Sequence, residues 1–290
     1  MPVVTKEPEG TSTPYKGVTF SYDGGPLLSN QAIKDRKEWL KTNQWDTISI
    51  GRHIPSNVKY MVVDVETHDW DIFDRNNRSK SRIVELAWLA YNASGVIVDS
   101  KQYLIKPHGY KEISSKAVEV HGITTKCAIE YGNYASDVFT EFVSILRALL
   151  RDGIVVAYNM INEHQIFNYN LSSEQCRVWN NIPKCDVYNI ALWKYLPPEA
   201  DDMYKKKCKS RKYGMKLQML HNIICPEKEI CSVPSHFAGG DVKMTWDIFC
   251  YYKQYATNYE LKWKHRNLVP STKYSGISVV TNVGPLIGLY

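Results

Sequence analysis

The fold is decided by the stretch Lys59-Tyr-Met-Val-Val-Asp-Val-Glu66. Its apolar, β-branched run predicts a buried strand that ends at Asp64. Residues two apart in a strand point to the same face, so the carboxylates of Asp64 and Glu66 can reach one cation. The carboxyl ends of such strands are where α/β sheets usually hold their sites. The alternative is a strand that ends in solvated acids, because D-x-E alone is a common sequence.

The flanking sequence predicts an α/β domain with a mixed sheet around this strand. Two strands are expected at 83–91 and 96–105, and the turn between them contains Gly95, which predicts an antiparallel hairpin. A short strand at 154–158 should run parallel to the first. Another strand is expected at 183–187, and helices are expected near 29–43, 137–151, 187–196, 214–224 and 240–257.

Composition bounds the class of protein. The chain has 290 residues, of which 44% are hydrophobic, enough for one domain with a sizeable core and extensions. A net charge of +6 weakly favours polyanionic partners. We expect no membrane span and no signal peptide. The 7 cysteines form no C-x-x-C pair, so we expect reduced thiols and a cytoplasmic or nuclear location, not secretion.

Two further segments carry candidate site residues. Asn159 and Glu163 follow the short strand, from whose end side chains can enter the same cleft. His236 and Asp241 form an H-x4-D sequence at the start of the last predicted helix. That spacing places a carboxylate on the first helical turn and an imidazole on the loop above it, which suits a metal ligand and a general base. The alternatives are an ordinary first-turn glutamate and a helix-capping aspartate.

In this order, the motifs resemble those of the DEDDh-type (DnaQ-like) 3′→5′ exonucleases, which include the proofreading epsilon subunit of bacterial DNA polymerase III and the three-prime repair exonucleases. The resemblance extends roughly from Lys59 to Tyr255. Ile113–Thr124 is similar to the family's HGIT segment, Cys185–Tyr188 to its DT strand and Tyr213–Leu220 to its KLxxL helix. The resemblance implies a ribonuclease-H-like fold, with a central mixed sheet flanked by helices on both faces.

The resemblance also implies a chemistry. Asp64, Glu66, Glu163 and Asp241 would bind two divalent cations, Mg²⁺ or Mn²⁺, and His236 would take a proton from the attacking water. The enzyme would be a phosphodiester hydrolase that degrades RNA or single-stranded DNA from the 3′ end and releases nucleoside 5′-monophosphates.

The second motif departs from the family's usual His-Asn-x-x-Phe-Asp. Glu163 stands in place of the aspartate and Asn162 in place of the aromatic residue. Glutamate keeps the charge and adds one methylene. Coronavirus-type proofreading exonucleases also have glutamate here, but this chain lacks their cysteine-rich zinc fingers. If Glu163 were not the fourth acid, Glu174 and Asp186 would be the candidates.

Candidate nucleic-acid contacts lie around these motifs. A basic loop at 70–82 and a basic run at 205–212 are expected to contact phosphates, with solvated surface loops as the alternative. The residues expected to bind nucleic acid are Thr67, His68, Arg75, Arg78, His121, Asn159, Lys205, Lys206, Lys207 and Arg211.

The chain is expected to have three parts. Residues 1–57 would form an arm with one possible helix, 58–257 the exonuclease domain and 258–290 a C-terminal extension. The arm could dock a protein partner, in which case the domain could be the proofreading nuclease of a polymerase. The other alternative is an inactive relative that only binds nucleic acid. The choice between DNA and RNA depends on contacts to the 2′-hydroxyl and stays open here.

Overall fold

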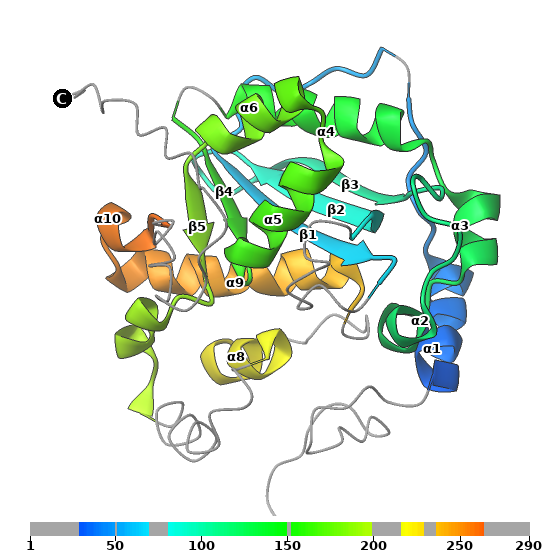
Figure 1. Ribbon diagram of the computed structural model, residues 1–290. Coiled ribbons are helices and arrows are strands. Elements are labelled where there is room, and N and C mark those ends of the chain that lie inside the picture. The colour runs from blue at the N-terminus through cyan, green and yellow to red at the C-terminus, as the bar shows by residue number, and fades with distance from the viewer. Residues whose placement is uncertain are drawn as a thin grey trace, which may run out of the picture.

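The computed structural model describes residues 29–49, 51–69, 81–149, 152–198, 216–228 and 236–263. Within these residues, five strands form one sheet in the order β3-β2-β1-β4-β5 (Figure 1). The strands are β1 (Tyr60–Thr67), β2 (Ile83–Tyr91), β3 (Ile97–Leu104), β4 (Ile154–Ala157) and β5 (Lys184–Asp186). The first three pair antiparallel, and β4 and β5 continue the sheet in parallel with β1. This arrangement confirms the predicted mixed sheet, the hairpin and the parallel fourth strand.

Helices cover both faces of the sheet, as predicted. The helices α4 (Ala135–Ala148), α5 (Met160–Asn170) and α6 (Ser173–Asn181) pack on one face. The long helix α9 (Ala238–Tyr255) crosses the other face, with α8 (Leu217–Ile224), the 3₁₀ helix η1 (Ile190–Tyr195) and α10 (Asn258–Leu261) near it (Figure 1).

A third group of helices lies at one side of the sheet. It consists of α1 (Ser29–Thr42), α2 (Ser115–His121) and α3 (Thr125–Tyr131) (Figure 1). Its apolar core includes Trp39 and Trp45 from the N-terminal segment and Phe237 from the residue before α9. The N-terminal helix is therefore packed into the domain.

The alternation of β1 decides which helix layer each of its side chains meets. Val63 belongs to the core under α4, and Val62 belongs to the core under α9. Because side chains two apart share a face, Asp64 and Glu66 lie on the α9 face with Val62. β1 continues past its predicted end at Asp64 and pairs with β2 as far as Thr67, so both acids lie inside the paired strand.

Several helices differ from the sequence prediction. The segment expected as a helix over 187–196 forms the shorter 3₁₀ helix η1. The sequence pattern does not predict α2, α3, α5 and α6. Two of these, α2 and α3, have 7 residues each, which is too short for an apolar periodicity to stand out. Their signal lies in the caps instead, since the Ser114 and Thr124 side chains accept hydrogen bonds from first-turn amides.

No helix among the described residues has the length and apolar character to cross a bilayer.

Candidate metal and catalytic site

Three of the predicted site residues come together at one edge of the sheet. Glu66 on β1, Asp241 on the first turn of α9 and His236 just before α9 each offer a ligand atom that lies within 4.8 Å of the other two. Glu66 and Asp241 are buried, and His236 is exposed. Two hard carboxylate oxygens and one imidazole nitrogen form a donor set that divalent cations accept.

Asp64 and Glu163 interact electrostatically with this group. Burial raises the pKa of Asp64 well above its usual range, and the carboxylates of Asp241, Glu163 and Glu66 raise it further. Burial, with Asp186 and Asp241, raises the pKa of Glu163 to about 8. Carboxylates influence one another this strongly only when they are close and poorly hydrated. The charges of Asp64 and Glu163 therefore act on the same centre as those of Glu66 and Asp241.

The cluster contains buried oxygens without a protein partner. Within the described residues, Glu163 Oε2 and Asp241 Oδ1 are buried and accept no hydrogen bond. Leaving a buried carboxylate uncompensated is costly, and mutual repulsion adds to the cost. Burial also raises the pKa of Asp241 to about 7. A divalent cation would supply the missing partner for these oxygens, so the residues fit the ions that the sequence analysis expected.

His236 is held in an unusual backbone conformation. Its φ is 65°, in the left-handed region that residues other than glycine seldom adopt. Desolvation by the surrounding protein and the charge of Lys216 lower the pKa of its ring to about 4, although the residue is exposed to solvent. Both its exposure and the direction of the shift leave the imidazole neutral at pH 7. A neutral ring can accept a proton, as a general base must.

The turn that carries Glu163 is fixed by Asp186. Asn159 follows β4 with φ 64°, and its backbone N–H donates to Asp186 Oδ1 at 2.9 Å. The backbone N–H of Tyr188 donates to the same oxygen at 3.0 Å. Because α5 starts directly after Asn159, this carboxylate anchors the turn from which α5 begins. Asp186 was an alternative for the fourth acid, and its hydrogen bonds show that it shapes the turn.

Glu174, the other alternative, lies away from the cluster. It is exposed on α6 and forms an ion pair with Arg147 of α4 at 3.3 Å. Its carboxylate is therefore on a solvated surface, away from the cluster.

Glu85 is a buried acid beside the cluster and belongs to none of the sequence motifs. It lies directly opposite Glu66 in the β1–β2 register and is fully buried. Its carboxylate is occupied by an ion pair with Arg36 at 2.9 Å, so it is not offered to a cation. The sequence did contain a signal, because this is the one charged residue in the apolar strand β2.

The expected nucleic-acid contacts have different surroundings. Thr67 and His68, at the end of β1, are partly exposed. The Thr67 hydroxyl donates to the Asp69 carbonyl at 2.8 Å, and His68 Nδ1 accepts from the Arg82 backbone at 2.9 Å. The remaining basic candidates lie outside the described residues: Arg75, Arg78, Lys205, Lys206, Lys207 and Arg211.

His121 has a structural environment. Its side chain is buried, its Nδ1 accepts from the Ile123 backbone at 3.0 Å, and its Nε2 lies 3.1 Å from the Thr67 carbonyl. Burial lowers the pKa of its ring to about 3, so the ring is neutral, and with Nδ1 accepting, Nε2–H is the donor. Both ring nitrogens are therefore used within the protein. The expected contact between His121 and nucleic acid does not fit this geometry, and His121 instead holds the end of β1.

Comparison with known proteins gives a structural likeness only. The sequence matches no protein-family model and no curated protein. Among solved structures, one of exonuclease I aligns with a TM-score of 0.52 at 15% identity, over 70% of this chain and 42% of that chain. The zinc-bound complex of E. coli exonuclease I with single-stranded DNA aligns with a TM-score of 0.51 at 16% identity, over 67% and 40%.

Exonuclease I from Methylocaldum szegediense aligns with a TM-score of 0.49 at 17% identity, over 69% of this chain and 41% of that chain. The chain spans about two fifths of the length of these proteins. At such identities the likeness concerns the fold. The chain has the mixed α/β fold of the ribonuclease-H-like exonucleases.

Proposed function

We propose that this chain is a metal-dependent 3′→5′ exonuclease of the DEDDh type, which hydrolyses RNA or single-stranded DNA from the 3′ end and releases nucleoside 5′-monophosphates. The observation that carries the proposal is the convergence of acids from separate segments beside a histidine. Glu66, His236 and Asp241 meet within 4.8 Å, and the charges of Asp64 and Glu163 adjoin them.

Asp64, Glu66, Glu163 and Asp241 would hold two divalent cations, Mg²⁺ or Mn²⁺. When bound, such ions acidify water and stabilise negative charge on phosphate oxygens. The unpartnered oxygens of Glu163 and Asp241 support this assignment, because a buried carboxylate needs a compensating charge. Glu163 adds a methylene to the usual aspartate. It lies on the first turn of α5, so the start of this helix fixes the position of its backbone.

The residues of the chain have distinct tasks in hydrolysis. His236, neutral at pH 7, takes a proton from the water whose oxygen attacks the terminal phosphorus. The bond between phosphorus and the 3′-oxygen breaks, leaving a strand one nucleotide shorter and a nucleoside 5′-monophosphate. Thr67 and His68, which are partly exposed at the end of β1, would contact the substrate. One structural neighbour was solved with single-stranded DNA, which supports a single-stranded substrate.

The proposal is tested with a panel of end-labelled substrates. Single-stranded and duplex forms of DNA and RNA are incubated with the protein in Mg²⁺ and in Mn²⁺. We expect stepwise shortening, fastest for a single-stranded substrate. Binding without any shortening, in every substrate and with both metals, would instead favour a relative that only binds nucleic acid.

Replacing Glu163 tests the fourth acid. Glu163→Gln keeps the shape and removes the charge, so we expect turnover to fall by roughly 10²-fold or more. Glu163→Asp keeps the charge on a side chain that is one methylene shorter. Its turnover should lie between that of Glu163→Gln and that of wild type. Glu174→Gln is the matched control, because it makes the same change on the exposed surface of α6. A Glu163→Gln enzyme as fast as wild type would remove Glu163 from the site.

Neutralising Lys205, Lys206 and Lys207 together tests the basic run. We expect weaker binding of every sequence alike and a shallower salt dependence, by about 0.7 in the log–log slope for each phosphate of a single strand that is no longer neutralised. Turnover at saturating substrate should change little. The solvated-loop alternative is right if affinity and salt slope both keep their wild-type values.

A further inference from the structure

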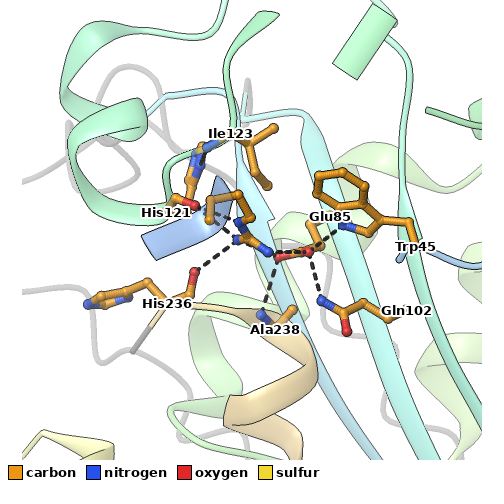
Figure 2. A network of polar contacts seen from close by, with 8 residues as sticks. Trp45, Glu85, Gln102, His121, Ile123, His236 and Ala238 are labelled. Atoms are coloured by element: carbon orange, nitrogen blue, oxygen red, sulfur yellow. Dashed lines mark hydrogen bonds and ion pairs between the residues drawn. The ribbon is translucent and has the colours of Figure 1, made fainter. Parts of the chain in front are cut away.

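An ion pair between Arg36 of α1 and Glu85 of β2 lies directly beside the candidate site (Figure 2). The two side chains meet fork to fork, with Nη1–Oε1 at 2.9 Å and Nη2–Oε2 at 3.1 Å. Trp45 Nε1 at 2.7 Å and Gln102 Nε2 at 2.9 Å also donate to Glu85 Oε1. Arg36 is 1% exposed and Glu85 0% exposed, so water does not weaken the pair.

The charge state of the pair is settled by these contacts. Burial alone would raise the pKa of Glu85, but Arg36, Trp45 and Gln102 together hold it below its usual range. Glu85 is therefore ionised, although it stands opposite Glu66 in the sheet. Burial and the neighbouring acids raise the pKa of Glu66 well above its usual range, and the positive charge of Arg36 opposes this rise.

The pair contacts each of the three residues at the start of α9, which are residues 236–238. Arg36 Nη2 reaches the carbonyl oxygen of His236 at 3.4 Å, a long contact. The guanidinium carbon lies 3.5 Å from the centre of the Phe237 ring, and this ring is buried. The backbone N–H of Ala238 donates to Glu85 Oε2 at 3.3 Å. Ala238 opens the helix, so its N–H has no acceptor within the helix.

The Arg36 side chain is also held by the end of α2. Its Nε and Nη2 both donate to the His121 carbonyl, at 3.1 and 2.9 Å. Gly122 then turns away with φ 72° and passes so close to α1 that a Cβ on it would lie 2.2 Å from the Ala32 carbonyl oxygen. Only glycine combines this backbone angle with this approach. α1 is therefore held in one position against α2.

We propose that Arg36 is a positioning residue for the exonuclease reaction: its pair with Glu85 fixes the backbone of residues 236–238, and with it the His236 imidazole and the first turn of α9. The strained φ of His236 makes such a support necessary, because an unsupported backbone would relax to a commoner conformation. Asp241 sits on that first turn, so one pair would align both groups. This inference rests on the proposed function.

The position of Arg36 bears on where the domain required for activity begins in the chain. The helix that carries Arg36 lies in the segment expected to be an arm. If the pair aligns the site, the working domain begins at or before α1, and a chain that starts at residue 58 would have the acids without their support.

Two sets of variants test the proposal. Arg36→Lys keeps the charge and loses the forked geometry. The double variant Arg36→Met/Glu85→Gln removes both charges at similar volume, which avoids leaving one buried charge unpaired. The matched control is Arg147→Met/Glu174→Gln, the same chemical change in an exposed pair between α4 and α6. For each protein, kcat and KM are measured on a single-stranded oligonucleotide, together with backbone hydrogen exchange.

We expect kcat to fall roughly 10- to 100-fold in both Arg36 variants, because displacements near 1 Å cost about that much, while KM stays close to wild type. Exchange should speed up at 237–241 and stay slow in β1 and β2. The control should match wild type in every measurement. Wild-type kcat with unchanged exchange at 237–241 would overturn the proposal. A loss of protection spread evenly over the domain would also overturn it, because the pair would then serve general stability alone.

The outcomes separate this inference from the proposed function. If the wild-type protein degrades no substrate, the proposed function fails. The exchange pattern at 237–241 still decides whether Arg36 fixes the start of α9, since that measurement needs no turnover.

Discussion

Asp64→Asn is expected to lower turnover by roughly 10³-fold or more and, at the same time, to stabilise the metal-free protein by about 1 kcal/mol. Turnover falls because the variant loses a charged ligand at constant shape. Stability rises because Asp64 is repelled by Asp241, Glu163 and Glu66, whose charges help to raise its pKa. Opposite effects on activity and stability are the signature of a site that keeps like charges together for function.

The measurement is single-turnover degradation of an oligonucleotide, combined with thermal unfolding with and without Mg²⁺. Wild type should be stabilised by Mg²⁺, and Asp64→Asn should gain much less from it, because ligand binding raises stability only where the site is intact. Glu174→Gln serves as the control for a lost surface carboxylate. An Asp64→Asn protein that is less stable than wild type without metal, yet still active, would contradict the assignment of Asp64.

His236→Ala is expected to have the next largest effect, a fall in kcat of about 10²- to 10⁴-fold, the usual range for loss of a general base. The carboxylates stay in place, so stabilisation by Mg²⁺ should persist. The control is His53→Ala, which removes an exposed histidine outside the cluster. Because His236 lies within ligand distance of Glu66 and Asp241, a second result is informative. If His236→Ala abolishes stabilisation by Mg²⁺, the ring is a ligand and the general-base role is wrong.

The central part of the fold follows from local sequence signals. The apolar run into Asp64 has strand character because both faces of β1 are buried, and the parallel β4 ends at the same edge of the sheet. This topology brings Asp64 and Glu163 together although they are far apart in the chain. The sequence could predict both segments, because each has its own apolar run followed by polar residues.

The support of the site could not be predicted in this way. Arg36 lies in a helix with an ordinary mixture of charges, and nothing local distinguishes it from its exposed neighbour Lys37. Its burial depends on Glu85, which meets it only when the sheet has formed. Asp186 is similar, since its role depends on the left-handed turn at Asn159, which belongs to another strand connection. Long-range pairs of single residues leave no periodic pattern in a sequence.

In the proposed function, this acidic cluster uses divalent cations to remove nucleotides from a 3′ end. The most direct measurement follows a 5′-labelled single-stranded oligonucleotide incubated with the wild-type protein in Mg²⁺ and in EDTA. We predict a ladder of labelled strands that shorten one nucleotide at a time in Mg²⁺, with nucleoside 5′-monophosphates as the product, and no shortening in EDTA. Shortening that persists in EDTA, or early release of the label as a mononucleotide, would contradict the account.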